Sequence, residues 1–163
     1  MAGEVISNGH ASALPLNVTT IADSLSAGGY RCAAFGKYDL GMHAWEYTPL
    51  RRGFEEFVGF YGPAQDHFTH SQGKFLDLRN GTAPLTTKNG VYSTNLYATA
   101  AVDWLERVGR ETPAAPTFTY LAFQAVHSPL QCPETYMNTA SCARLKNTRR
   151  RTLCGMMAAV DEG

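Results

Sequence analysis

The chain has 163 residues, of which 44% are apolar and 17% charged, a length and composition typical of one globular domain. Lys plus Arg and Asp plus Glu both number 14, so the formal net charge is zero. A neutral chain has no overall field that favours nucleic acid, and no segment approaches the ~20 apolar residues of a membrane span. We therefore expect no nucleic-acid partner and no membrane span.

Helix and strand signals alternate from the first motif onward. A capping-box pattern at residues 20–23 predicts a short helix that stops at Gly28-Gly29. The compact apolar run over 30–35 predicts a strand, which Gly36-Lys37 should end. Residues 53–60 alternate enough to indicate a second strand.

The second half repeats this order. Ser93 or Thr94 can cap a helix, whose apolar face includes Trp104. Residues 117–123 then read TFTYLAF, which predicts a buried strand. The alternation indicates an α/β domain with a largely parallel sheet flanked by helices, and ligand sites in such domains lie beyond the carboxyl ends of the strands.

Two residues at these strand ends could act on an anion. Lys37 lies between Gly36 and Gly41, in a turn that could aim a cation into a crevice, although a lone Lys in this place is more often a surface charge. His127 follows the second buried strand and precedes Pro129 by two residues. Its imidazole could protonate a leaving group or could equally be a structural His.

The segment Asp66–His70 reads DHFTH and offers a carboxylate and two imidazoles within five residues. The helical HExxH spacing of a zinc site is absent. We therefore interpret these residues as part of a polar loop or a substrate pocket, and we predict no metal site in this chain.

Cysteines and sequons bear on the compartment. Cys32 falls in an apolar run and is expected in the core, whereas Cys132, Cys142 and Cys154 could pair in an oxidising compartment or stay reduced. N-glycosylation sequons begin at Asn17 and Asn80. The opening residues show no signal-peptide pattern.

Several separated motifs, in the same order, resemble the arylsulfatases of the alkaline-phosphatase superfamily, most closely the arylsulfatase B type. The matching segments cover most of the chain from about residue 14: LSAGGYRCAAFGKYDLG (25–41), PLRRGFEEFVGFYG (49–62), DHFTH (66–70), YSTN (92–95), TYLAFQAVHSPLQCPETY (119–136) and GMMAAVDE (155–162). The resemblance implies a partial alkaline-phosphatase-like sandwich, with residues 1–163 forming an internal fragment of the N-terminal catalytic domain.

The resemblance also implies a chemistry. Similar enzymes hold a sulfate ester over calcium and attack its sulfur with the hydrate of formylglycine, an aldehyde made from Cys or Ser. By the same pattern, Lys37 contacts the sulfate oxygens, and His127 contacts sulfate and assists the leaving group. Both would be catalytic and substrate-binding residues.

The sequence departs from the family at one site residue and at one motif. Asp39 stands where the usual GKWHLG motif has His, which places a carboxylate near an anionic substrate and should weaken binding by like-charge repulsion. The CxPSR or SxPSR motif does not occur, and no calcium ligand can be assigned. We expect formylglycine and calcium to be supplied by parts missing from this chain.

Three functions remain open at this point. The first is a fragment of a secreted or lysosomal sulfuric-ester hydrolase, inactive alone, whose complete form cleaves aryl or carbohydrate sulfates. The second is an inactive sulfatase-derived module that binds sulfated glycans, which Asp39 favours. The third is a phosphoester hydrolase of the same superfamily.

Overall fold

A five-stranded sheet with the order β6-β5-β2-β1-β7 organises the chain. The computed structural model describes residues 11–163. The sheet contains β1 (Arg31–Lys37), β2 (Glu56–Phe60), β5 (Arg79–Asn80), β6 (Ala83–Pro84) and β7 (Thr117–Ala122). The three long strands β2, β1 and β7 run parallel, while β5 and β6 are short and antiparallel. The largely parallel sheet predicted from the sequence is thus confirmed.

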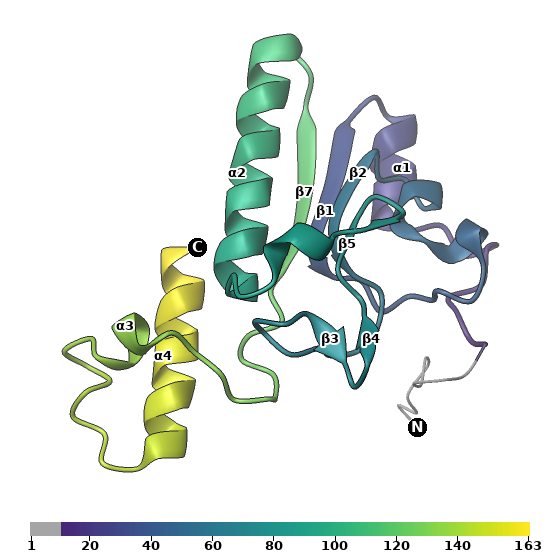
Figure 1. Cartoon of the computed structure of the whole chain (residues 1–163). Coiled ribbons are helices and arrows are strands. Elements are labelled where there is room, and N and C mark those ends of the chain that lie inside the picture. Colours follow the sequence, from purple (N-terminus) through teal and green to yellow (C-terminus); the bar gives the residue numbers. More distant parts are fainter. Residues whose placement is uncertain (1–10) are drawn as a thin grey trace.

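Helices lie on both faces of this sheet (Figure 1). The α-helices are α1 (Ile21–Ala27), α2 (Ser93–Glu111), α3 (Glu134–Met137) and α4 (Thr148–Glu162). The remaining elements are the hairpin strands β3 (Ser71–Gln72) and β4 (Phe75–Leu76), and three 3-10 helices at Trp45–Tyr47, Pro49–Arg51 and Thr86–Lys88. In Figure 1, α3 and α4 form a lobe beyond one end of α2, apart from the sheet.

Side chains of β1 alternate between two hydrophobic cores, because successive strand residues point to opposite faces. The core under α2 contains Ala33, Phe35, Val58, Phe60, Leu78, Leu96, Tyr97, Ala101, Trp104 and Val108. The core under α1 contains Ala22, Cys32, Ala34, Tyr38, Phe54, Phe57 and Tyr61. With both faces covered, β1 is the buried centre of the molecule, and Cys32 lies in a core as predicted.

The capping box that begins α1 has the predicted form. Thr20 Oγ1 accepts a hydrogen bond from the Asp23 amide at 3.0 Å, and an Asp23 carboxylate oxygen accepts one from the Thr20 amide at 2.9 Å. The two side chains therefore satisfy amide groups that the first helical turn leaves free.

Two strand predictions need correction. Strand β1 includes Gly36 and ends at Lys37, whereas the prediction ended it at Phe35. A Cβ on Gly36 would come within 2.0 Å of the Ala122 carbonyl oxygen, so this glycine lets β1 and β7 approach closely and does not break the strand. Strand β7 is not buried: it lies at the edge of the described sheet, and Tyr120 is 42% exposed.

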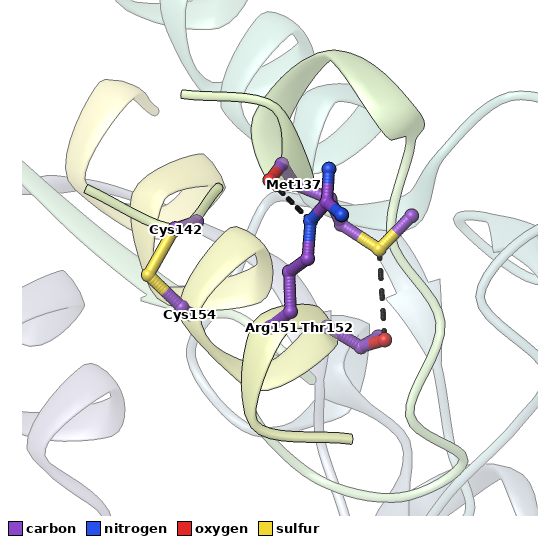
Figure 2. Close-up of a disulfide and its surroundings, with 5 residues drawn as sticks. All are labelled: Met137, Cys142, Arg151, Thr152 and Cys154. Atoms are coloured by element: carbon purple, nitrogen blue, oxygen red, sulfur yellow. Dashed lines mark hydrogen bonds between the residues drawn. A yellow bond between two sulfur atoms is a disulfide. The ribbon is translucent and has the colours of Figure 1, made fainter. Parts of the chain in front are cut away.

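A disulfide ties the α3–α4 lobe together. Cys142, in the loop before α4, is bonded to Cys154 within α4 (Figure 2). Beside it, Arg151 Nε donates to the Met137 carbonyl oxygen at 3.0 Å, which fixes the end of α3 against α4. Of the three cysteines whose pairing the sequence left open, Cys132 stays a free thiol.

Candidate functional site

Lys37 and His127 lie beyond the carboxyl ends of neighbouring parallel strands. Lys37 is the last residue of β1, and His127 follows the end of β7 by five residues. The two strands are in register up to Gly36 opposite Ala122. The prediction that both residues lie beyond the carboxyl ends of the strands is therefore confirmed. Their side chains do not contact each other.

Lys37 is not a free cation in this structure. Its Nζ lies 3.3 Å from Asp39 Oδ2, with both side chains about 30% exposed. Asp39 has a left-handed backbone, with φ of 51°, and its amide donates to the Tyr61 carbonyl oxygen at 3.2 Å. Its other carboxylate oxygen, Oδ1, is buried without a hydrogen-bond partner. Asp39 thus stands at the site as an anion paired with the lysine proposed to hold sulfate.

His127 presents an exposed imidazole whose tautomer follows from its neighbours. Its Nδ1 lies 2.7 Å from the Ser128 carbonyl oxygen. Because a carbonyl oxygen only accepts, Nδ1 carries the proton in this contact. The Nε2 atom is then the ring nitrogen left to accept a proton or, in the imidazolium form, to donate one.

The DHFTH segment forms a buried polar loop, and among residues 11–163 no group of three or more His, Cys, Asp or Glu is arranged to hold a metal. His67 and His70 are both almost fully buried. His67 Nε2 lies 3.3 Å from the His127 carbonyl oxygen, and His70 Nε2 lies 3.0 Å from that of Lys88. The segment is thus a buried polar loop, and both imidazoles contact main-chain carbonyl oxygens.

The start of α2 differs from its prediction for a reason connected with this loop. The N-cap is Tyr92, without a side-chain hydrogen bond, and Ser93 and Thr94 are already helical. Ser93 Oγ is instead 3.0 Å from His67 Nδ1. Its hydroxyl is used to hold the buried imidazole, which a local capping pattern could not reveal.

Sequence reasoning missed two glutamines under the His127 turn. The side-chain amide of Gln124 donates to the Gln65 carbonyl oxygen, and Gln65 Nε2 lies 2.6 Å from the Tyr97 hydroxyl. Both glutamines are buried, and each leaves its side-chain oxygen without a partner. Gln124 directly follows the apolar run of β7, but its partner is 59 residues away, so no local pattern indicated the contact.

An aromatic depression lies next to Asp39, whose amide donates to the carbonyl oxygen of its lining residue Tyr61. It encloses about 550 Å³ and is lined by Met42, His43, Ala44, Trp45, Glu46, Tyr61 and Arg79. Trp45 is 59% exposed, and the Arg79 guanidinium stacks 4.9 Å from the centre of the Tyr61 ring. Tyr61 itself is buried, so the exposed Trp45 ring is the aromatic face and Arg79 the cation that could meet a sugar next to an anionic group.

Within residues 11–163, the side chains do not fit the calcium and formylglycine that the resemblance implies. The Asp39 carboxylate is taken by Lys37, and the described residues hold no cluster of carboxylates around it. Cys142 and Cys154 are bonded together, Cys32 is buried in a core, and the free Cys132 is followed by Pro133-Glu134 and not by the xPSR of the motif. We therefore assign no step to either group.

The two N-glycosylation sequons, which bear on the cellular compartment of the protein, are exposed. Asn17 and Asn80, which begin the two sequons, both lie at the surface, Asn80 in the short β5–β6 hairpin. In the described part of the chain, no helix has the length and apolar character needed to cross a membrane.

Comparison with known proteins gives a consistent assignment. The sulfatase family model matches residues 2–163. The chain is 35% identical to mouse arylsulfatase J over 155 residues, covering 91% of this chain and 25% of that protein. It is 31% identical to the arylsulfatase of Klebsiella aerogenes over 127 residues, covering 74% and 26%. The chain thus spans about a quarter of the length of these relatives.

A solved structure shares the fold. The crystal structure of Ps i-CgsB in complex with k-i-k-neocarrahexaose superposes with a TM-score of 0.85 at 25% identity, covering 98% of this chain and 37% of that one. The family match along almost the whole chain and this shared architecture show that the chain belongs to the sulfatase family, sulfuric-ester hydrolases with an alkaline-phosphatase-like fold.

Proposed function

We propose that residues 1–163 form part of the catalytic domain of an arylsulfatase-type sulfuric-ester hydrolase and supply two of its sulfate contacts. The observation that carries this proposal is the position of Lys37 and His127 beyond the carboxyl ends of adjacent parallel strands. Crevices at such ends are where open α/β sheets bind ligands. The sequence similarity to arylsulfatases supports the reaction class.

In this proposal the two residues act on different oxygens. Lys37 Nζ holds non-bridging sulfate oxygens, whose charge persists throughout the reaction. When the S–O ester bond breaks, negative charge develops on the departing oxygen. His127 Nε2, in the imidazolium form, gives its proton to that oxygen, while Nδ1–H stays bonded to the Ser128 carbonyl oxygen. Nucleophilic attack on sulfur is not assigned to any residue of this chain.

A carbohydrate sulfate is the substrate class that we favour over a simple aryl sulfate. The depression lined by Trp45 and Arg79 provides one exposed aromatic face and a cation for a sugar ring and a further anionic group. The structural relative Ps i-CgsB was crystallised with k-i-k-neocarrahexaose, an oligosaccharide ligand of that protein.

A second function, a module that binds sulfated glycans without cleaving them, is favoured by Asp39. The carboxylate 3.3 Å from Lys37 Nζ competes with sulfate for the cation and stands where the family has His. Such a site would bind sulfate more weakly than one with a free lysine. The binding-module function therefore keeps the same contacts but removes the turnover.

The test begins with sulfate binding. The 15N-labelled chain is titrated with sodium sulfate at low ionic strength, and chemical shifts of His127 and of residues near Lys37 are followed. Lys37→Ala and His127→Ala should each weaken binding by about threefold or more, because each loses a charge-assisted hydrogen bond. Lys74→Ala, at an exposed lysine of the β3–β4 turn, is the matched control and should leave affinity unchanged.

Turnover then separates the candidate functions. Aryl sulfate and sulfated oligosaccharide hydrolysis are measured on the chain and on the protein expressed from its complete coding sequence. Hydrolysis by the latter supports the hydrolase, and binding without hydrolysis supports the module. Preferential turnover of aryl phosphate would replace both by a phosphoester hydrolase. Absence of any sulfate response at His127 in the chain would contradict the assigned contacts.

We also propose a secreted or lysosomal location. The Cys142–Cys154 bond needs an oxidising compartment, and both sequons are exposed where a glycosyltransferase could reach them. Expression through a eukaryotic secretory pathway should give a mass that falls after N-glycosidase treatment, and Asn17→Gln with Asn80→Gln should abolish the change. An unmodified secreted chain would contradict the role of the sequons.

A further inference from the structure

The loop between β2 and β3 holds the turn that carries His127. We propose that His67 in this loop is a positioning residue, which fixes the direction of the His127 imidazole by binding its main-chain carbonyl. The inference rests on the proposed function, in which His127 contacts sulfate. It gives a role to the DHFTH segment, which that function leaves unused.

The His67 imidazole makes one contact with each of two distant segments. Its Nε2 is 3.3 Å from the His127 carbonyl oxygen, and its Nδ1 is 3.0 Å from Ser93 Oγ. The carbonyl oxygen only accepts, so Nε2 carries the proton, and the neutral ring accepts from the Ser93 hydroxyl at Nδ1. The buried ring thus connects the first turn of α2 to the main chain of the candidate site.

Burial keeps this arrangement in one form. The His67 side chain is 0% exposed, and burial lowers the pKa of His67, which favours the neutral ring. A neutral ring has a single N–H, and the geometry directs it at the His127 carbonyl oxygen. Losing that partner would leave a buried carbonyl or ring nitrogen unpaired, which is costly.

A second contact holds the turn from its other side. The His67 amide donates to Gln131 Oε1 at 2.9 Å, and Gln131 Nε2 donates to Asp66 Oδ2 at 2.6 Å. Gln131 lies four residues after His127, while the His127 amide donates to the Gln124 carbonyl oxygen at 2.9 Å. The main chain is therefore fixed before, at and after His127, although the imidazole itself is exposed.

His70 shows that burial alone does not explain the arrangement. It comes from the same segment and is also almost fully buried, and its Nε2 also lies against a main-chain carbonyl, that of Lys88 at 3.0 Å. Lys88 belongs to a different part of the chain from the His127 turn. His70 is therefore a matched control with the same chemistry and a different partner.

The experiment compares three variants of the full 163-residue chain. His67→Asn and His70→Asn each retain a polar group near the place of Nδ1 and lose the reach of Nε2. Asn also tolerates the left-handed backbone of His70, whose φ is 57°. His67→Gln keeps an amide N–H near the place of Nε2 and is the rescue variant. Thermal unfolding first confirms that each variant is folded.

Two measurements are made on each variant. The first is hydrogen exchange of the His127 amide, which reports order in the turn without any ligand. The second is the dissociation constant for inorganic sulfate from the shift of the His127 ring signals. We expect His67→Asn to accelerate exchange about tenfold and to weaken sulfate binding about threefold to tenfold, as the loss of one buried hydrogen bond implies. His67→Gln and His70→Asn should stay within about twofold of the parent chain.

Equal effects of His67→Asn and His70→Asn, or failure of His67→Gln to restore exchange, would overturn the proposal. If His67→Asn does not fold, Ser93→Ala removes the hydroxyl that holds the His67 ring at Nδ1, and unchanged His127 exchange in that variant would also overturn the proposal. The experiment distinguishes failure of the proposed function from failure of the positioning role of His67. Without sulfate binding in the parent chain the proposed function fails, while exchange still reports whether His67 positions the turn.

Discussion

The region around β1 and the region beyond β7 carry one candidate site residue each, yet they are stabilised differently. Strand β1 is packed on both faces, and Phe35 at its centre is 1% exposed. Strand β7 has β1 as its neighbour on one edge and is partly exposed along its length. Beyond it, the chain is held by buried hydrogen bonds at the His127 turn and by the Cys142–Cys154 bond.

Because of this difference, the availability of Lys37 for sulfate is set by a neighbouring charge, whereas that of His127 is set by the conformation of its turn. Lys37 is fixed by a rigid strand, so its availability depends on the charge next to it, Asp39. His127 has no opposite charge within salt-bridge distance in residues 11–163, so its availability depends on the order of its turn. Substitutions near Lys37 should therefore change sulfate affinity through charge. Substitutions near His127 should change it through the order of the turn, which amide hydrogen exchange measures.

The largest expected effect tests the packing difference. Phe35→Ala should lower the free energy of unfolding by about 3–5 kcal/mol, because it leaves a cavity in the core under α2. Leu121→Ala in β7, which is only partly buried, should cost about 1–2 kcal/mol. Urea unfolding followed by circular dichroism measures both. Equal losses would show that β7 is as firmly packed as β1.

Removing the disulfide should have the next largest effect, greatest in the region beyond β7. The bond joins residues 12 apart, so Cys142→Ala with Cys154→Ala should cost about 3 kcal/mol through greater freedom of the unfolded chain. Cys132→Ala, at a free thiol nearby, should cost about 1 kcal/mol or less. Hydrogen exchange should rise in α4 before it rises in β1, and a uniform rise would contradict the proposed separation.

Local patterns predicted the local features. The Thr20 and Asp23 capping box, the parallel arrangement of the main strands and the strand-end positions of Lys37 and His127 follow from residues close together in the chain, or from the chirality and packing rules of α/β folds.

Contacts between distant segments could not be predicted in this way. The exposure of β7 depends on which strand lies beside it, and the His67–His127 contact joins residues 60 apart. Asp39 was expected to repel a substrate, but its pairing with Lys37 became visible only in the structure. Side-chain partners are set by tertiary packing, which neither periodicity nor turn signals encode.

A smaller effect is expected from removing the negative charge next to Lys37. Asp39→Asn removes the charge while keeping a residue that accepts the left-handed backbone, so Lys37 becomes free for an anion. Sulfate affinity of the chain should rise about twofold to fivefold, as expected for a partly exposed ion pair. Asp103→Asn, at an exposed carboxylate of α2, is the control and should have no effect. Unchanged affinity in Asp39→Asn would mean that the ion pair does not compete with sulfate.

The smallest effect concerns the loop that holds His127 and appears only in acid. Burial alone would raise the pKa of Asp66, but hydrogen bonds from the Thr69 amide, the Gln131 side chain and the Phe68 amide outweigh it and lower the pKa to about 2. The charged carboxylate therefore stabilises the folded chain above pH ~4, and this contribution is lost as the pH falls from ~4 toward 2.

Asp66→Asn keeps the side-chain oxygen that accepts from the Phe68 and Thr69 amides but cannot titrate. The variant should therefore be less stable than the parent chain at pH 6, and the difference should shrink toward pH 3, as measured by urea unfolding at several pH values. His127 amide exchange should follow the same pH dependence in the parent chain and a weaker one in the variant, because Asp66 acts on the turn through Gln131. If both chains lose stability in parallel between pH 5 and 3, the acid sensitivity belongs to other carboxylates, and the turn is held by the His67 contact alone.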